Sequence, residues 1–167
     1  MNCGDEMECS VCCFSGHREI PGEDREPLAF LLYRYVTQLA DCGTKEFYCG
    51  GALGFDTMAA QAVLKARERD PEIRLYLAIP YRGMERHWSP EKRVPYARIL
   101  EQADRVVYLS ERYDSGCMLR RNRYMVDRSS ICLCYMLKNT GGTAYTVAYA
   151  LKRGLEVVNL ALEVDNT

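Results

Sequence analysis

The chain has 167 residues, of which 48% are hydrophobic and 27% are charged, so it is long enough for one domain with a sizeable core. Its net charge of −1 provides no overall basic field, which argues against nucleic acid and anionic membranes as partners. No apolar run reaches the roughly 18 residues of a spanning helix, and the opening MNCGDEMEC lacks the basic and apolar regions of a signal peptide. We therefore expect a cytoplasmic protein with no membrane partner.

The cysteines raise the question of disulfides or a metal site. Their number, nine, is odd, and Cys49, Cys132 and Cys134 lie inside apolar runs, where a thiol behaves as a small buried hydrophobe. Cys9 and Cys12 belong to a CxxC pattern, but we expect it on a strand, where side chains three apart point to opposite faces. Buried thiols are favoured over zinc, and we predict neither a metal nor a cofactor.

Apolar runs and amphipathic segments alternate along the chain after a polar stretch, 1–8, that we expect to be a flexible tail. The apolar runs are short, as in buried parallel strands, and the segments between them have apolar residues three and four apart, as in helices that pack by one face. Asp56 is placed to cap the second helix and Pro71 to end it, while Ser89-Pro90 can open a turn in the loop 81–94. The predicted strands are 9–14, 46–49, 73–79, 105–109, 131–137 and 156–160. The predicted helices are 28–39, 57–70, 96–103, 117–127 and 144–152.

The connections between these strands are too long for hairpins. Strands joined by helical crossovers pair in parallel, because each crossover returns the chain to the same end of the sheet. The alternation therefore predicts an α/β fold: a doubly wound, Rossmann-like parallel sheet with the first strand central and helices on both faces. We expect one such domain over 9–162.

Polar or glycine-rich segments follow four of the predicted strands. Ligands of doubly wound sheets bind outside the carboxyl ends of the strands, so we expect these segments to converge on one crevice. No GxGxxG follows the first strand, which argues against a dinucleotide site. The four segments are 15–18, 50–56, 110–112 and 139–143.

The segment Asn139-Thr140-Gly141-Gly142-Thr143 links an apolar run to a periodic one. A helix that begins here would present free backbone N–H groups to an anion such as phosphate, and glycines would let the chain approach it closely. The alternative is a plain strand-to-helix turn, in which Gly-Gly is common.

Several motifs resemble a known superfamily. The run GGALGFDTMAA, 50–60, resembles the GGAxGxDxxAA signature of the SLOG superfamily, which includes the DNA-processing protein DprA and the Lonely Guy phosphoribohydrolases. FSGHR, 14–18, is similar to its first-strand loop, and GGTAYT, 141–146, resembles the same run in the YpsA-like branch. The resemblance extends over 9–160 and implies a homo-oligomer.

Lonely Guy enzymes cleave the N-glycosidic bond of nucleoside monophosphates with an Arg in RKxxM and a Glu in PGGxGTxxE. Arg121-Asn122-Arg123-Tyr124-Met125 resembles the first motif, with Asn122 in place of Lys. The Glu of the second motif falls on Thr146 or Ala148. The oxocarbenium-like transition state thus lacks its carboxylate, which argues against this activity and leaves Arg121 as a phosphate or ribose contact.

Each candidate residue has an ordinary structural alternative. His17 could act as a general acid, stack on a base, cap a loop or face solvent. Asp56 could bind ribose or cap a helix, and each arginine could hold phosphate or lie free on the surface. No catalytic residue is assigned. The predicted nucleotide- or phosphate-binding residues are Ser15, Gly16, His17, Arg18, Gly50, Gly51, Gly54, Asp56, Arg112, Arg121, Asn122, Gly141, Gly142 and Thr143.

The leading hypothesis is a module that binds or senses a nucleotide-derived small molecule, such as a nucleoside phosphate or an ADP-ribose-like compound. A second hypothesis is a nucleotide N-glycosidase that draws its carboxylate from another loop, at Glu19, Asp56, Glu111 or Asp114. A third is a binder of single-stranded DNA, which the charge balance disfavours because such proteins need a basic groove with stacked aromatics.

Overall fold

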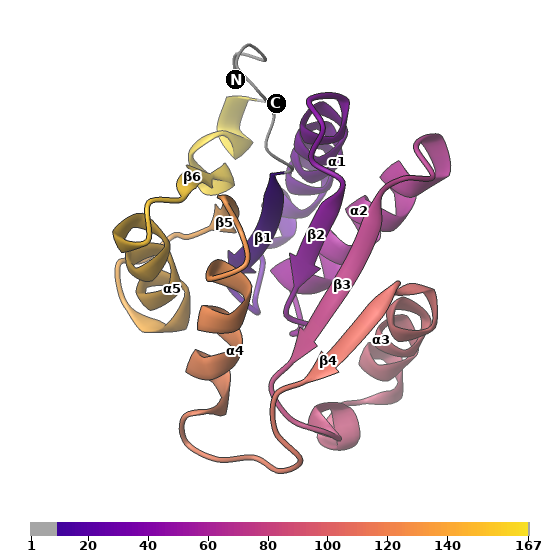
Figure 1. Cartoon of the computed structure of the whole chain (residues 1–167), viewed down its shortest axis with the longest axis vertical. Coiled ribbons are helices and arrows are strands. Elements are labelled where there is room, and N and C mark those ends of the chain that lie inside the picture. The colour runs from indigo at the N-terminus through magenta and orange to yellow at the C-terminus, as the bar shows by residue number, and fades with distance from the viewer. Residues whose placement is uncertain (1–9, 167) are drawn as a thin grey trace.

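The computed structural model describes residues 10–166, which form a six-stranded parallel sheet in the order β4-β3-β2-β1-β5-β6 (Figure 1). The first strand lies near the centre, as predicted, and the chain moves outward in one direction through β4 before returning to β5 on the other side of β1. The strands are β1 Val11–Gly16, β2 Glu46–Cys49, β3 Arg74–Ile79, β4 Arg105–Tyr108, β5 Ile131–Tyr135 and β6 Glu156–Asn159. The predicted tail, 1–8, and Cys9 lie outside the described residues.

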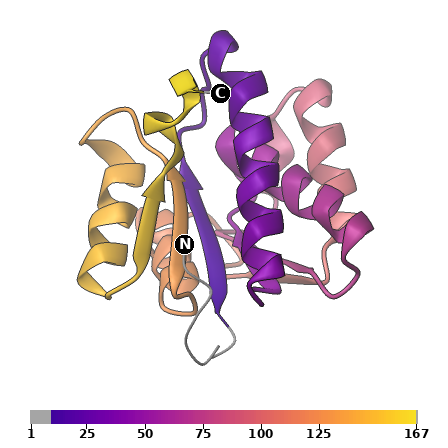
Figure 2. The same ribbon diagram turned by 90° about the horizontal axis from the view of Figure 1, so that it is seen from above.

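Helices cover both faces of the sheet, which confirms the predicted doubly wound α/β fold. Three of them, α1, α2 and α3, lie on one face, while α4 and α5 lie on the other (Figures 1 and 2). The α-helices are α1 Arg25–Asp41, α2 Phe55–Arg69, α3 Pro90–Gln102, α4 Cys117–Val126 and α5 Gly141–Lys152.

The sheet separates two hydrophobic clusters, because successive side chains of a strand point to opposite faces. Phe14 and Phe47 face α1 and α2, and the Phe14 ring lies 6.2 Å from that of Phe47 and 6.3 Å from that of Phe55. Cys13 and Tyr48 face the other way, into the smaller cluster below α4 and α5. Both faces of the central strands are therefore buried, which accounts for their nearly continuous apolar sequences.

Four of the five α-helices begin earlier than their apolar periodicity predicts: α1 by three residues, α2 by two, and α3 and α5 as follows. α3 begins at Pro90 rather than at residue 96, and Pro95 lies inside it. Proline is favoured at the first helical position, and the first turns of α3 are exposed, so they carry no apolar pattern. α5 begins at Gly141 rather than at residue 144, which places both glycines of the 139–143 segment in its first turn.

The expectation of buried thiols is confirmed for the three cysteines on which it was based, Cys49, Cys132 and Cys134, each of which is free and buried. Cys12, Cys13 and Cys117 are also free and buried. Within residues 10–166, no group of three or more His, Cys, Asp or Glu side chains is arranged to hold a metal ion.

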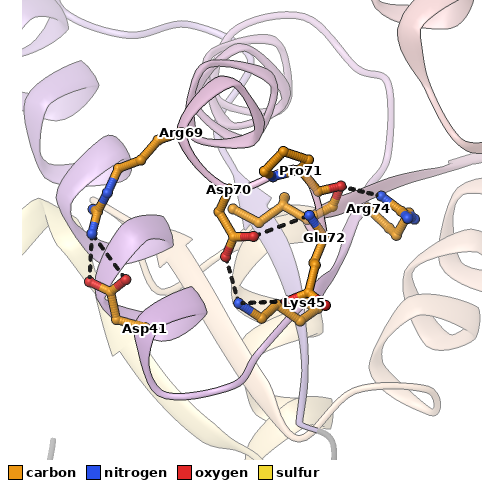
Figure 3. A network of polar contacts seen from close by, with 8 residues as sticks. Asp41, Lys45, Arg69, Asp70, Pro71, Glu72 and Arg74 are labelled. Carbon is orange, nitrogen blue, oxygen red and sulfur yellow. Dashed lines mark hydrogen bonds and ion pairs between the residues drawn. The ribbon is translucent and has the colours of Figure 1, made fainter.

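An ionic network fastens the helices at the amino ends of β2 and β3, opposite the end where the candidate site lies (Figure 3). The carboxylate of Asp70 accepts hydrogen bonds from Lys45 Nζ and from the backbone N–H of Glu72, and Arg69 pairs with Asp41 at 3.1 Å. The hydrogen bond from Lys45 is the largest of the effects that lower the pKa of Asp70. This network ties the end of α2 to the residue that precedes β2.

We expect Asp70→Asn to destabilise the protein at neutral pH by less than about 1 kcal/mol, because the pair is only partly buried. Since the pKa of Asp70 is lower in the folded state, its contribution is present above the unfolded pKa and is lost as the pH falls through the folded value. Urea unfolding at pH 7 and near pH 2 measures the change. Glu68→Gln, at an exposed carboxylate on α2, is the control; a difference between wild type and Asp70→Asn that persists in acid would contradict the assignment.

Candidate functional site

A cavity of about 320 Å³ lies at the carboxyl end of β1, between the first turn of α5 and one face of α4. This first cavity is of the size that small ligands occupy. As expected from the positions of the polar segments, Ser15 after β1 and Gly142 after β5 line the same space. Its lining residues are Phe14, Ser15, Gly16, His17, Arg18, Ala52, Asp56, Met118, Arg121, Asn122, Met125, Gly142 and Thr143.

One face of α4 forms a wall of the first cavity. Met118, Arg121, Asn122 and Met125 are three, four and seven residues apart, so they fall on one side of the helix, and all four line the cavity. The periodicity predicted the helix, but it did not indicate that the two methionines face the site. Their helical spacing with Arg121 was the signal that could have identified them.

Arg121 is buried in this wall, with 5% of its surface exposed. Its Nη1 donates to the backbone carbonyl of Gly50 and, at 3.5 Å, to that of Ala78, while Nε donates to Asn122 Oδ1 at 2.7 Å. Burial lowers the pKa of the guanidinium, and the nearby carboxylate of Asp56 opposes that shift. Within residues 10–166 its second terminal nitrogen, Nη2, has no hydrogen-bond partner, so it remains available to a ligand.

Asp56 faces Arg121 across Gly50. A Cβ on Gly50 would lie 2.4 Å from Arg121 Nη1 and 2.7 Å from Asp56 Oδ2, so a larger residue cannot stand between the two charged groups. Burial raises the pKa of Asp56, whereas Arg121 and the backbone N–H of Ala52, which donates to Oδ2 at 3.2 Å, lower it. Gly50 is therefore a spacer for this charged pair and does not line the first cavity.

The helix-cap interpretation of Asp56 is wrong. α2 begins at Phe55, its N-cap residue is Gly54, and no side chain accepts a hydrogen bond there. Asp56 lies one residue inside the helix, from where its carboxylate points to the Ala52 N–H and lines the first cavity. Because of the tight turn at Gly54, α2 begins two residues earlier in the chain than predicted. Asp56 therefore lies inside the first turn of the helix, and its side chain points toward the site.

Three predicted glycine contacts have packing roles that the sequence did not reveal. Gly54 has a φ of +76°, and a Cβ there would stand 2.1 Å from the carbonyl oxygen of Arg18. Gly51 also has a positive φ, while a Cβ on Gly16 would meet the ring of Phe55 at 2.4 Å. Gly51 and Gly54 do not line the first cavity. Gly54 lets the loops after β1 and β2 touch, while Gly51 makes room for the side chain of Ile79.

The first turn of α5 supplies polar groups that have no partner within the described residues. No side chain caps this helix, and its first turn carries no acidic residue. Ser15, from β1, and Thr143 are 7% and 8% exposed, and neither hydroxyl makes a hydrogen bond to residues 10–166. Gly141 has the left-handed φ of +88°, whereas Gly142 has an ordinary φ, and a Cβ at either position would have no neighbour within 4 Å.

His17 joins the loop after β1 to the loop after β5. Its Nε2 accepts a hydrogen bond of 2.9 Å from the backbone N–H of Leu137, and its ring contacts that of Tyr135 edge-on. The backbone carbonyl of His17 accepts from the N–H of Phe55 at 3.1 Å. Of the four roles left open by the sequence, this geometry supports the loop cap, because the Nε2 lone pair is already engaged.

Arg112 lies apart from the predicted residues that meet in the first cavity. It is exposed, and its neighbour Ser110 uses its hydroxyl to bond the Arg112 backbone. Among the carboxylates considered for catalysis, Glu111 pairs with Arg82 and Asp114 pairs with Arg120, both away from the cavity. Asp56 is the candidate carboxylate that lines it.

Comparison with known proteins identifies the family. A model of the YspA SLOG family matches residues 23–161, which is most of the chain. The chain belongs to the YspA SLOG family. This finding agrees with the resemblance that the GGALGFDTMAA and GGTAYT runs suggested.

The curated relatives are similar over most of the chain. The UPF0398 protein BH1768 of Halalkalibacterium halodurans is 31% identical over 121 residues, which are 71% of this chain and 64% of that protein. The uncharacterized SPbeta prophage-derived protein YoqJ of Bacillus subtilis is 28% identical over 118 residues, 64% of this chain and 69% of YoqJ. The chain thus spans slightly less than two thirds of the BH1768 protein.

Solved structures of DNA processing protein A share the fold. The protein from Streptococcus pneumoniae gives a TM-score of 0.64 at 15% identity, over 89% of this chain and 49% of that one. The Helicobacter pylori protein, whose structure is described for its single-stranded DNA binding mode, gives 0.60 at 17% identity, over 89% and 64%. At these identities the likeness establishes the Rossmann-like fold. In the described part of the chain, no helix is long and apolar enough to cross a membrane.

We expect the loop at Leu137 to loosen in acid, because protonated His17 cannot accept its N–H. Burial, and then the charge of Lys138, lower the pKa of His17 below its usual 6.5. The stability that neutral His17 provides is therefore present above pH 6.5 and is lost as the pH falls through the folded pKa. NMR titration of the imidazole, with amide exchange at Leu137, measures both effects. A His17 that titrates at or above 6.5 would contradict this assignment.

Proposed function

We propose that the first cavity binds the phosphate of a nucleotide-derived small molecule. The observation that carries the proposal is the convergence of unpartnered donors on one buried space: the hydroxyls of Ser15 and Thr143, the Nη2 of Arg121 and the uncapped start of α5. Among residues 10–166, none of these side-chain donors is a fully buried atom without a partner, so each is open to the cavity and can donate to a ligand that supplies the acceptors. Phosphate supplies several acceptor oxygens and suits both a guanidinium and a helix N-terminus.

The charges around the cavity favour an anion. Arg18 and Arg121 line it together with a single carboxylate, that of Asp56, so the local charge is positive although the chain as a whole is not. Field lines concentrate in such a low-dielectric pocket, which strengthens the attraction for an anionic ligand. Membership of the SLOG family supports a nucleotide-related ligand at this position.

Asp56 keeps the N-glycosidase hypothesis open to a direct test. Glycoside hydrolysis usually uses two carboxyl groups on either side of the scissile bond, whereas the first cavity has Asp56 alone among its lining residues. The charge of Arg121 and the hydrogen bond from the Ala52 N–H both stabilise this carboxylate in its ionised form. We therefore propose a binding module that does not turn over its ligand.

We expect Gly142→Val to weaken binding of AMP about thirtyfold, which corresponds to roughly 2 kcal/mol, while the fold persists. The side chain would meet no protein atom within 4 Å of its Cβ, so its effect falls on the ligand that approaches the first turn of α5. Calorimetric titration of AMP, ADP-ribose and adenosine measures the loss, and the phosphate-free adenosine should be affected least.

Gly22→Val is the matched control, because a Cβ at Gly22 also has no neighbour within 4 Å and Gly22 lines neither this cavity nor its neighbours. Equal affinities for wild type and Gly142→Val would rule out the phosphate site. Chromatography of the same mixtures should show no free adenine, and rapid adenine release that Asp56→Asn abolishes would establish the glycosidase instead. Arg121→Ala is a poor probe, since it would leave Asp56 buried without its cation.

A second candidate function is binding of single-stranded nucleic acid, and a specific arrangement favours it. Arg105 lies 4.8 Å over the ring of Tyr76, Tyr76 is 5.3 Å from Tyr48, Tyr48 is 6.1 Å from Tyr124, and Arg128 lies 3.6 Å over Tyr124. The arginines lie at the two ends of this series, next to Tyr76 and Tyr124, while Tyr48 in the middle is buried. Cations beside aromatic rings are the groups that bind the phosphates and unpaired bases of a single strand. The fold assembles this Arg–Tyr series from β2, β3, β4, α4 and the turn after α4, so the sequence did not show it as a cluster.

This candidate predicts that oligothymidine binds with an affinity that falls steeply with salt, and that the double variant Arg105→Ser, Arg128→Ser weakens it at least tenfold. Fluorescence anisotropy measures both effects. Arg98→Ser with Arg93→Ser, two exposed arginines of α3, is the charge-matched control. Binding that is equal in both double variants would exclude the Arg–Tyr series as the nucleic-acid surface.

Homo-oligomerisation stays a proposal that rests on the resemblance. Segment 117–136 is rich in methionine and aromatic residues, which makes it a candidate for an apolar interface, but Met118 and Met125 line the first cavity and Val126 is buried. Leu119 is the exposed large apolar side chain of this segment. The segment therefore offers less apolar surface for a partner than its composition suggested.

A further inference from the structure

A second cavity, of about 550 Å³, adjoins the first and shares two of its lining residues, His17 and Arg18. The rest of its lining comes from the loop before α1 and the loop after β5. These residues are Glu19, Ile20, Pro21, Leu137 and Lys138. Because the two cavities share His17 and Arg18, a single ligand held by its phosphate in the first can extend past these side chains into the second.

The walls of the second cavity suit a flat, weakly polar ring. Ile20 is buried and Pro21 is half-buried, while Leu137 exposes 52% of its surface although it lies beside the cavity. A large apolar side chain at the mouth of a cavity gains most when a ligand covers it, because burial removes its surface from water. The edge of the His17 imidazole completes this apolar part.

The second cavity is held in place by the hydrogen bond from the Leu137 N–H to His17 Nε2, which fixes the loop after β5 against the loop after β1. Its polar rim has one group of each charge, the carboxylate of Glu19 and the ammonium of Lys138. Glu19 is exposed and has no hydrogen-bond partner within residues 10–166, so it can accept from an amino group or a ribose hydroxyl.

We propose that the second cavity is a ring subsite, which receives the base of a nucleotide whose phosphate lies in the first cavity. This inference rests on the phosphate site proposed above and narrows its ligand class, because a sugar phosphate or free phosphate would leave the apolar wall uncovered. The ligand is a nucleotide or a larger nucleotide derivative, and its ring contributes part of the affinity.

The test compares ligands that differ only in the base. In calorimetric titrations with wild type, at least one of AMP, GMP, CMP and UMP should bind at least tenfold more tightly than ribose 5-phosphate. Leu137→Ser should reduce that nucleotide's advantage to roughly threefold or less and leave the affinity for ribose 5-phosphate unchanged. Leu162→Ser, at another exposed leucine that does not line either cavity, is the control and should change neither affinity.

The two proposals fail in different ways. If ribose 5-phosphate binds in a manner that depends on Gly142 but no nucleotide binds more tightly, the phosphate site stands and the ring subsite is overturned. If a nucleotide binds more tightly but Leu137→Ser leaves its advantage intact, the ring lies elsewhere and the subsite is again overturned. If neither ribose 5-phosphate nor any nucleotide binds, both proposals are wrong.

Discussion

The site depends on one buried cation. Arg121 enters the interior from α4. Its Nη1 and Nε donate to the backbone carbonyls of Gly50 and Ala78 and to the amide oxygen of Asn122, and the charge of Asp56 stabilises it further. An isolated charge at this depth would cost several kcal/mol, so the surrounding loops must hold their acceptors in place. Gly50 makes this possible because it has no side chain between the two charged groups. The path of the chain after β2 therefore depends on the hydrogen-bond acceptor that it supplies to Arg121.

The end of β1 is the junction through which the other loops are positioned. The carbonyl of His17 accepts from Phe55 at the start of α2, its Nε2 accepts from Leu137 after β5, and the backbone of Arg18 packs against Gly54. These contacts leave Ser15 and the first turn of α5 on either side of one cavity. Because each contact uses backbone or a ring nitrogen, the loops are fixed while the hydroxyls of Ser15 and Thr143 stay free for a ligand.

Sequence reasoning predicted the fold well, because apolar periodicity reports burial and burial fixes the strands and most helices. It located the cavity from the polar residues that follow β1 and β5, since the carboxyl ends of parallel strands meet at one edge. It could not separate the glycines that meet a ligand from those that meet protein: Gly50, Gly51 and Gly54 pack against Arg121, Ile79 and Arg18. Nor could it place Asp56, because that depends on where the turn at Gly54 ends. These roles are set by contacts between residues far apart in the chain.

The net charge of the chain likewise does not reveal the local charge of a site. A net charge of −1 provides no overall basic field, but the same composition yields a cavity with two arginines and one carboxylate and, elsewhere, the Arg–Tyr series. Acidic side chains elsewhere in the chain bring the total to −1, whereas Asp70 and Asp41 at the far ends of the strands are already paired with Lys45 and Arg69. Charges separated by more than about 10 Å of salt solution hardly interact. The sign of the local charge, rather than the net charge of the chain, therefore decides which ligand binds. Composition therefore limits non-specific attraction, and the specific anion site arises from the fold.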